Sequence, residues 1–156
     1  MKLYHGSNVE IESIDLARGR KGKDFGKGFY ANPDYMQAVE FCSSVIRREG
    51  VGVPTVTSFD FDESALNVLN VMRFDGYSKE WAAFILLNRN NTSDVPAHDY
   101  DSVVGPIADD GVGTQIRRLS RGFITFDAFL EELKYSKVSI QYFFGTEEAI
   151  KYLKKI

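Results

Sequence analysis

Hydrophobic and polar positions along the chain predict short strands interspersed with helices. Strands are indicated where β-branched and aromatic residues alternate with polar ones, at residues 2–6, 29–31, 54–62 and 138–146 and within 99–110. Apolar residues that recur every three or four positions predict helices at residues 33–49, 78–90, 125–136 and 147–156. The elements follow one another without a regular strand–helix–strand period, so the pattern predicts one α+β domain over residues 1–156.

Residues that favour helix ends mark most of these boundaries. Asn32 is a predicted N-cap, with Pro33 in the first turn of the helix that follows, and Gly50 ends that helix. Ser78 is the predicted cap of the next helix. In the segment 147–156 the glutamates come first and the lysines last, which complements a helix dipole. We therefore expect the chain to close with a helix.

Composition narrows the class of protein without changing this picture. The chain has 156 residues, of which 44% are hydrophobic and 26% charged. A chain of this size buries about 68–70% of its unfolded surface and needs no disulfide for stability. Cys42 is the only cysteine, so we expect it in the core and the protein in a reducing compartment. The N-terminus lacks the apolar core of a signal peptide and no segment is apolar enough to span a membrane, so the expected location is the cytoplasm.

Charge and motif spacing exclude several kinds of site. Nineteen basic and 22 acidic residues give a net charge of −3, so no overall positive field attracts nucleic acid or an anionic membrane. The spacing from Gly22 to Gly26 is one residue short of a phosphate-binding P-loop, and no strand leads into G-x-G-x-x-G. Two histidines and one cysteine offer no metal-ligand spacing, so no metal is expected.

Three polar or aromatic residues at strand ends are candidates for chemistry. His5 stands in "YHGS" at the end of the first strand, Tyr30 ends "GKGFY", and Gln141 lies in the last strand. Each also has an ordinary structural interpretation. A histidine at a strand end is commonly hydrogen-bonded, a tyrosine after a turn is commonly in the core, and a strand glutamine commonly faces solvent.

Taken together, these motifs resemble those of a known superfamily. "YHGS", "FGKGFY" and the following "A..FC" resemble the catalytic domain of the poly(ADP-ribose) polymerases, with an ungapped match from Phe25 to Cys42. The chain is still more similar to a bacterial family catalogued as a domain of unknown function, number 3990. That family is grouped with the ADP-ribosyltransferases and often occurs in toxin–antitoxin-like gene pairs. It shares "YHGS", "DFGKGFY", "YD.V.GP.ADD" and a last strand containing glutamine, so the resemblance covers nearly the whole chain.

This resemblance implies an ADP-ribosyltransferase-like fold that binds NAD⁺. In such a fold, two small mixed or antiparallel sheets form a cleft and helices flank them. His5 would hydrogen-bond a ribose hydroxyl, and Ser7 would add a ribose contact. Gly6 would offer its backbone N–H and C=O to the nicotinamide carboxamide, because a residue without a side chain lets a ligand approach the main chain. Tyr30 and Phe41 would stack on the two faces of the nicotinamide ring.

The resemblance also assigns a role to the basic loop before the glycine motif. Arg20 and its neighbours in residues 18–23 would favour the pyrophosphate of NAD⁺. The alternative is that this loop is a solvated charged surface with no ligand.

The expected reaction breaks the bond between nicotinamide and ribose. In the family a glutamate usually hydrogen-bonds the ribose 2′-hydroxyl and assists the acceptor, and Gln141 stands in its place here, giving an H-Y-Q set. An amide can bond that hydroxyl but cannot act as a general base, which favours transfer of one ADP-ribose over chain elongation. Ala38 replaces a serine that often contacts the carboxamide. Asp109 and Asp110 could offer a carboxylate, or serve as turn and capping residues.

The resemblance therefore implies an NAD⁺-dependent mono-ADP-ribosyltransferase, expected to be a toxin with an antitoxin protein as its partner. The acceptor is macromolecular, and the acidic net charge favours protein over nucleic acid. Two alternatives stay open at this point. Gln141 could mark a catalytically inactive module that binds NAD⁺, ADP-ribose or a protein, or the domain could take no ligand at all.

Overall fold

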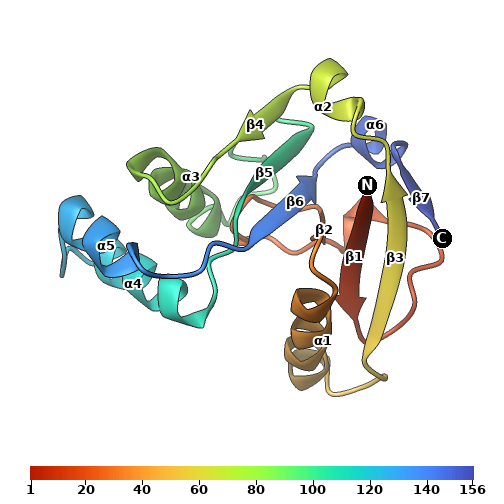
Figure 1. The fold of residues 1–156 in the computed structure, drawn as a ribbon, viewed down its shortest axis with the longest axis horizontal. Coiled ribbons are helices and arrows are strands. Elements are labelled where there is room, and N and C mark those ends of the chain that lie inside the picture. The colour runs from red at the N-terminus through yellow and green to blue at the C-terminus, as the bar shows by residue number, and fades with distance from the viewer.

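Two small sheets and the helices around them make up the protein (Figure 1). The computed structural model describes residues 1–156, except for the side chain of Asp110. Seven strands are found in this described part of the chain: β1 (Lys2–Ser7), β2 (Phe29–Ala31), β3 (Thr55–Phe61), β4 (Val71–Arg73), β5 (Ser102–Pro106), β6 (Ile140–Phe144) and β7 (Leu153–Lys155). Six α-helices accompany them: α1 (Tyr35–Glu49), α2 (Ala65–Val68), α3 (Lys79–Arg89), α4 (Asp110–Ser120), α5 (Phe126–Leu133) and α6 (Glu147–Ile150). A short 3₁₀ turn, η1 (Leu16–Arg18), interrupts the connection between β1 and β2.

The two sheets differ in their strand pairing. The first has the order β1-β3-β7 and is antiparallel throughout. The second has the order β2-β6-β5-β4 and is antiparallel except for the parallel pair of β4 and β5. One isolated bridge joins the sheets, because the N–H and C=O of Tyr4 both bond the backbone of Asn32. The α+β class and the two small sheets expected from the sequence are confirmed.

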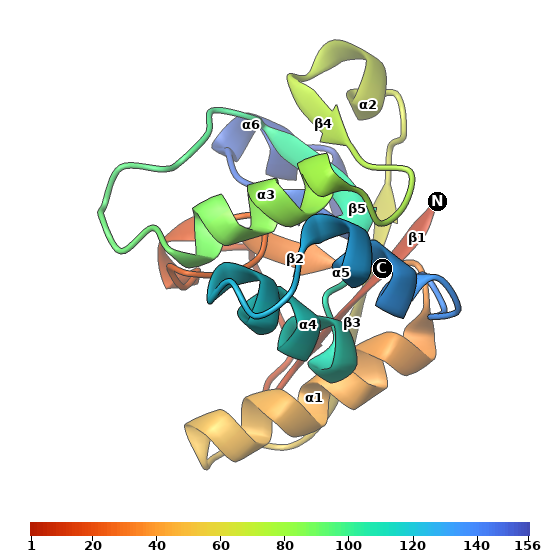
Figure 2. The same ribbon diagram turned by 90° about the vertical axis from the view of Figure 1, so that its left-hand side faces the viewer.

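The alternation of side chains along β2 and β6 separates two hydrophobic cores. Phe29, Tyr142 and Phe144 point into a core between the two sheets. Tyr30 and Phe143 point to the opposite face, into a core covered by α3, α4 and α5, which lie together on that side (Figure 2). Since successive strand residues face opposite sides, Gln141 shares the face of Phe143. The sheet itself therefore places Gln141 and Tyr30 on one side.

Most predicted elements are present at the expected positions. The strands at 2–6, 29–31, 54–62 and 138–146 and the helices at 78–90 and 125–136 correspond to β1, β2, β3, β6, α3 and α5. Ser78 caps α3 by accepting the amide of Trp81, and Gly50 ends α1 with a φ of 71°. Cys42 is buried, as expected.

The predicted terminal helix is wrong beyond Ile150. The chain turns after α6 and adds β7 to the edge of β3, with Phe61 opposite Leu153. The Lys155 ammonium forms ion pairs with Glu10 and Glu12 at 2.9 Å each. Pairing with an open sheet edge and these distant carboxylates outweighs the local helix preference of the segment.

Asn32 is also not the cap of α1. The cap is Asp34, whose Oδ1 accepts the amides of Met36 at 2.9 Å and Gln37 at 3.4 Å. Asn32 is held in extended conformation by its bridge to Tyr4. A further helix, α4, was not predicted, and Asp109 is its cap, accepting the amide of Val112 at 3.0 Å.

The revised cap predicts different effects for two neighbouring substitutions. Asp34→Ala should lower the free energy of unfolding by about 1 kcal/mol, because two helix amides lose their acceptor. Asn32→Ala should not lower it, because the buried Oδ1 of Asn32 has no hydrogen-bond partner in the described structure to lose. Urea denaturation of the two variants measures the difference, and equal losses would contradict this assignment of the cap.

Candidate functional site

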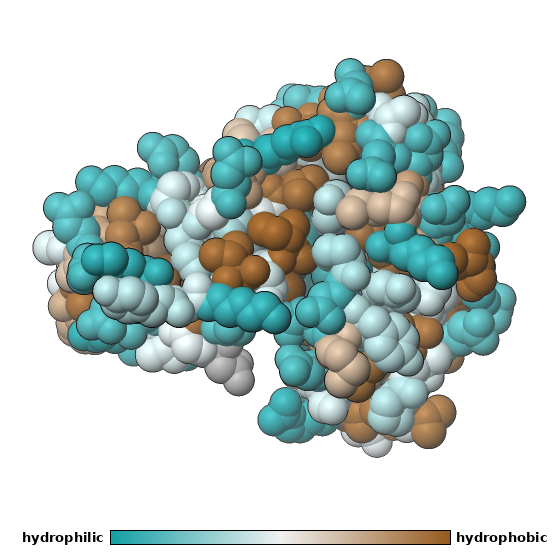
Figure 3. Space-filling view, in the orientation of Figure 1, coloured by the Kyte–Doolittle hydropathy of each residue, from teal (hydrophilic) through white to brown (hydrophobic). Residues whose placement is uncertain are grey.

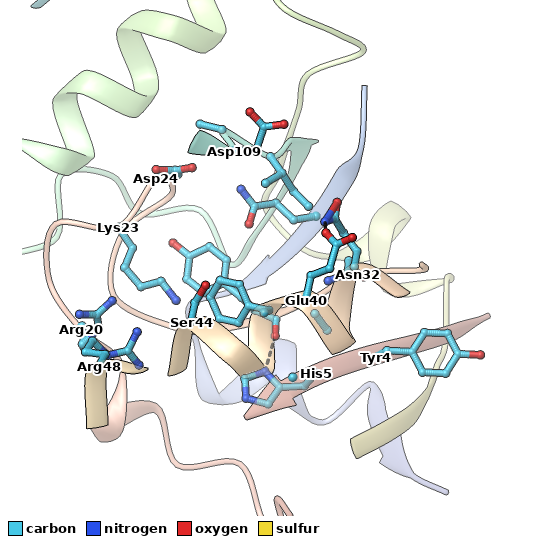
Figure 4. A pocket seen from close by; sticks show the side chains of 18 of the residues that line it. Tyr4, His5, Arg20, Lys23, Asp24, Asn32, Glu40, Ser44, Arg48 and Asp109 are labelled. Carbon is cyan, nitrogen blue, oxygen red and sulfur yellow. Dashed lines mark hydrogen bonds between the residues drawn. The ribbon is translucent and has the colours of Figure 1, made fainter. Parts of the chain in front are cut away.

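A cavity of about 740 Å³ lies where the end of β1 meets the glycine loop, α1, β6 and the start of α4. In the space-filling view the molecule is hollowed between the side that carries α4 and the side that carries α1 (Figure 3). Figure 4 shows side chains from these segments facing one another across the cavity. Its volume falls within the range of about 300–1,000 Å³ that is usual for small-molecule sites.

Most site residues expected from the sequence meet in this one cavity. The residues that line it include His5, Gly6, Arg20, Tyr30, Phe41 and Gln141. Ser7 is the exception, because it is buried outside the lining and its Oγ donates to Asn8 Oδ1 at 3.3 Å. A histidine, two aromatic rings and an amide from separate segments of the chain thus line one open cavity.

His5 presents a neutral imidazole to the cavity. Its Nδ1 lies 2.6 Å from the carbonyl oxygen of Tyr30, and its ring stacks on Phe29 with centroids 4.4 Å apart. Burial lowers the pKa of His5 to about 4; the Tyr30 carbonyl opposes this shift and the charge of Lys23 adds to it. Because a carbonyl only accepts, Nδ1 carries the proton and Nε2 is left as an acceptor for a ligand hydroxyl.

Tyr30 contributes its ring rather than its hydroxyl. The hydroxyl donates to Gly26 O at 2.6 Å and accepts the amide of Phe25 at 3.0 Å. Burial, the main cause, raises the pKa of this phenol well above its ordinary value. The turn depends on Gly26, whose φ of 103° favours glycine. The phenol therefore stabilises the glycine loop, and the ring alone is available to a ligand.

Gly6 has main-chain groups that face away from β3. In an antiparallel ladder the hydrogen-bonded and non-hydrogen-bonded pairs alternate, and Tyr4 directs both of its groups away from β3, to Asn32. Gly6 is two residues further along β1, so its N–H and C=O point to the same side. A Cβ atom at Gly6 would overlap the carbonyl oxygen of Ala38 in α1. The glycine is therefore required for helix packing, a reason different from the ligand approach expected from the sequence.

Asn32 is a site residue that the sequence analysis assigned to a different role. It lines the cavity, and its Oδ1 is buried without a hydrogen-bond partner in the described structure. An unsatisfied buried acceptor is costly, so this atom is suited to a donor on a ligand. The only feature of the sequence that could have indicated Asn32 as a site residue is its position directly after the predicted strand "FYA", which ends beside Tyr30.

Positive charge gathers at one end of the cavity. Arg20 from the glycine loop and Arg48 from the last turn of α1 lie together at its edge (Figure 4). Lys23 extends between them and the rings, with Nζ 4.2 Å from the centroid of Tyr30 and 5.4 Å from that of Phe41. Burial lowers the pKa of Lys23 to about 8, with Arg20 and Arg48 adding to the shift. The sequence analysis identified the basic loop but not the contribution of α1.

The acidic and amide groups of the cavity are few and mostly engaged. Asp109 lines the cavity and also caps α4. The Glu40 carboxylate accepts a hydrogen bond from the side-chain amide of Gln37 at 2.8 Å. The side chain of Asp110 lies outside the described part of the structure. The Gln141 side chain makes no hydrogen bond with any described residue. This amide is free to bond a ligand hydroxyl.

Two further properties concern the described residues as a whole. No three histidine, cysteine or carboxylate side chains among them are grouped so that they could hold a metal ion. None of the helices in this part of the chain has the length and apolar character needed to cross a membrane.

The environment of His5 predicts how stability depends on pH. The folded imidazole takes up a proton only near pH 4, while the unfolded one does so near its ordinary 6.5. The contribution of neutral His5 to the free energy of unfolding is therefore complete above pH 6.5 and is lost as the pH falls toward 4. His5→Asn, whose amide can still donate to the Tyr30 carbonyl, should flatten the pH dependence of unfolding between pH 6.5 and 4. Denaturation at stepped pH measures the difference, and equal slopes in the two proteins would contradict a neutral His5.

Comparisons with known proteins identify one family. The family model described as "Protein of unknown function (DUF3990)" matches residues 1–155. No curated protein and no solved structure matches the chain. Because the family model covers nearly every residue, the chain belongs to this DUF3990 family.

Proposed function

We propose that the protein is an NAD⁺-dependent mono-ADP-ribosyltransferase with an ADP-ribosyltransferase-like fold. The observation that carries the proposal is the meeting of His5, Gly6, Tyr30, Phe41 and Gln141 in one cavity with a basic edge. Each group presents the polarity that a different part of NAD⁺ requires.

The ring end of the cavity suits nicotinamide. The faces of Tyr30 and Phe41 carry the negative π density that attracts a flat cationic ring. The outward N–H and C=O of Gly6 complement a carboxamide, which both donates and accepts. The unpaired Oδ1 of Asn32 would accept a second carboxamide hydrogen, which compensates for Ala38 at the position where relatives have a serine.

The opposite end suits the phosphates and the adenosine half. Arg20 and Arg48 provide guanidinium groups, which form charge-assisted hydrogen bonds with phosphate oxygens. Nε2 of His5 is an acceptor for a ribose hydroxyl, and because its imidazole is neutral it adds no further positive charge to the cavity.

The proposed reaction transfers ADP-ribose from nicotinamide to an acceptor at ribose C1′. The C1′–N bond breaks and its electron pair neutralises the pyridinium, so that nicotinamide leaves uncharged. The acceptor nucleophile forms the new bond to C1′ and releases its proton to water. The Gln141 amide would hold the 2′-hydroxyl in place, and this preorganisation lowers the barrier without a charged base. Such a site favours one transfer to an acceptor that is already nucleophilic.

The net charge of −3 favours a protein acceptor over nucleic acid. We further propose that the activity makes the protein a toxin held in check by an antitoxin protein. A second candidate function rests on Gln141, because an uncharged amide in place of a carboxylate is also what an inactive NAD⁺-binding module would have.

Turnover of NAD⁺ separates these functions. The wild-type protein should release nicotinamide and attach labelled ADP-ribose to protein. His5→Ala should reduce the rate by about 100-fold or more, the loss expected when a positioned polar group leaves a reactive site, while Gln141→Glu should retain or raise it. Chromatography of released nicotinamide measures both.

Ser7→Ala is the matched control, because Ser7 is two residues from His5 on the same strand but lies outside the cavity, and it should leave the rate unchanged. Expression of the wild-type protein should slow growth, and His5→Ala should relieve it. Binding of NAD⁺ without release of nicotinamide would favour the inactive module.

Asn32→Ala tests the carboxamide contact without the complication of lost stability. NAD⁺ should bind about fivefold to tenfold more weakly to the variant, because one hydrogen bond is worth about 1 kcal/mol. Calorimetric titration with NAD⁺ measures the affinity. ADP-ribose, which has no carboxamide, should bind both proteins equally, and parallel weakening of both ligands would count against this contact.

A further inference from the structure

The ammonium group of Lys23 occupies the space that faces the two aromatic rings. Its Nζ lies 4.2 Å from the Tyr30 centroid and 5.4 Å from the Phe41 centroid. Figure 4 shows the side chain running from the glycine loop into the cavity. In the described structure the ammonium group of Lys23 forms no hydrogen bond and no ion pair. Asp24, the nearest carboxylate in sequence, is bound to Arg89 Nε at 2.7 Å instead.

The charges around Lys23 oppose its position. Burial is the main cause that lowers the pKa of Lys23 to about 8; Arg20 and Arg48 add to this shift, and the charge of Asp24 opposes it. The π faces of the rings are a further compensating interaction. A charge that is partly desolvated, close to like charges and without a directly paired anion is held weakly, and a lysine side chain has a flexible stem that allows it to move.

We propose that Lys23 makes the cavity selective for ring ligands that also carry a pyrophosphate. In the free protein its ammonium fills the ring slot. It leaves the slot when the ligand phosphates provide it with a counter-ion beside Arg20 and Arg48. The inference rests on the proposed function, because it takes NAD⁺ as the ligand and the Tyr30–Phe41 slot as the place of its ring.

Electrostatics makes this displacement necessary for NAD⁺. The pyridinium of NAD⁺ is itself a cation, and two cations within a few ångströms in a partly desolvated slot repel each other. The same ligand carries the two negative phosphates that can draw the ammonium away. Arg20, Arg48 and the withdrawn Lys23 would then surround the pyrophosphate with three positive groups.

The consequence is discrimination against free nicotinamide. Nicotinamide would have to displace the ammonium from the rings without offering it an anion. It should therefore bind weakly, so that the product of the proposed reaction leaves readily and inhibits little. Lys23 is in this sense a specificity-determining residue for the intact dinucleotide.

Lys23 is also the group in this region whose charge should change near pH 8. The other groups that face it are Arg20 on the loop, Arg48 on α1, the Asp24–Arg89 pair between loop and α3, His5 on β1 and the Tyr30 phenol. The guanidinium groups stay charged, His5 is neutral above about pH 4, and burial keeps the phenol protonated. Deprotonation of Lys23 weakens its attraction to the rings, so nicotinamide should bind more tightly as the pH rises through 8.

Calorimetric titration of wild-type protein and Lys23→Ala with nicotinamide, ADP-ribose and NAD⁺ tests the inference. The variant should bind nicotinamide about tenfold more tightly, because the competing cation–π contact is gone, and ADP-ribose about tenfold more weakly, because a phosphate contact is lost. Lys27→Ala is the matched control, since Lys27 is exposed in the same loop and does not line this cavity. It should change neither affinity.

A second measurement varies the pH and follows the affinity for nicotinamide. The affinity of the wild-type protein for nicotinamide should rise between pH 6.5 and 9, while that of Lys23→Ala should stay constant. Unchanged or weaker nicotinamide binding by the variant, or a wild-type affinity independent of pH, would overturn the role of Lys23 while leaving the proposed function intact. Failure of the wild-type protein to bind any of the three ligands would overturn the proposed function and this inference together.

Discussion

The candidate site depends on the hydrogen bonds of one residue, Tyr30. Its hydroxyl bonds the amide of Phe25 and the carbonyl of Gly26, which holds the glycine loop in a tight turn. Its own carbonyl accepts Nδ1 of His5, which holds the end of β1. Two segments, the glycine loop and β1, are thus tied to β2. Because the bond to Phe25 is buried and the other two are partly buried, breaking them would leave unsatisfied groups, and the walls of the cavity would no longer be fixed relative to one another.

The same arrangement determines which chemistry each residue can perform. Tyr30 cannot act as an acid while its hydroxyl is engaged in the turn, and His5 cannot act as a cation while burial keeps it neutral. Neither residue is therefore suited to transfer a proton, and in the proposed function both recognise and orient the ligand. Charge is distributed unevenly in the cavity, with cations from the loop and α1 gathered at one end and the uncharged Asn32 and Gln141 among the residues elsewhere in its lining.

Local patterns predicted the elements whose stability is local. β2 and α3 were found because short apolar runs and a serine cap identify them within a few residues. β7 was missed because its stability comes from a distant partner strand, and its sequence alone favours a helix. Asn32 was assigned as a cap for a similar reason. Its bridge to Tyr4 involves residues far apart in the chain, so nothing in the neighbouring sequence distinguishes it from a capping asparagine.

The candidate site shows the same limit at the level of single side chains. His5 and Tyr30 could be selected because they stand in motifs with a recognised spacing, and their convergence agrees with that selection. Arg48 could not, because its importance comes from charges that approach one another only when α1 packs beside the loop, and Lys23 could be predicted only as one of the basic residues of that loop. A lysine in a glycine-rich loop reads as an ordinary solvated residue until its surroundings are known. The positive end of the cavity is therefore a product of tertiary packing, which brings the Lys23 ammonium close both to the two rings and to the charges of Arg20 and Arg48.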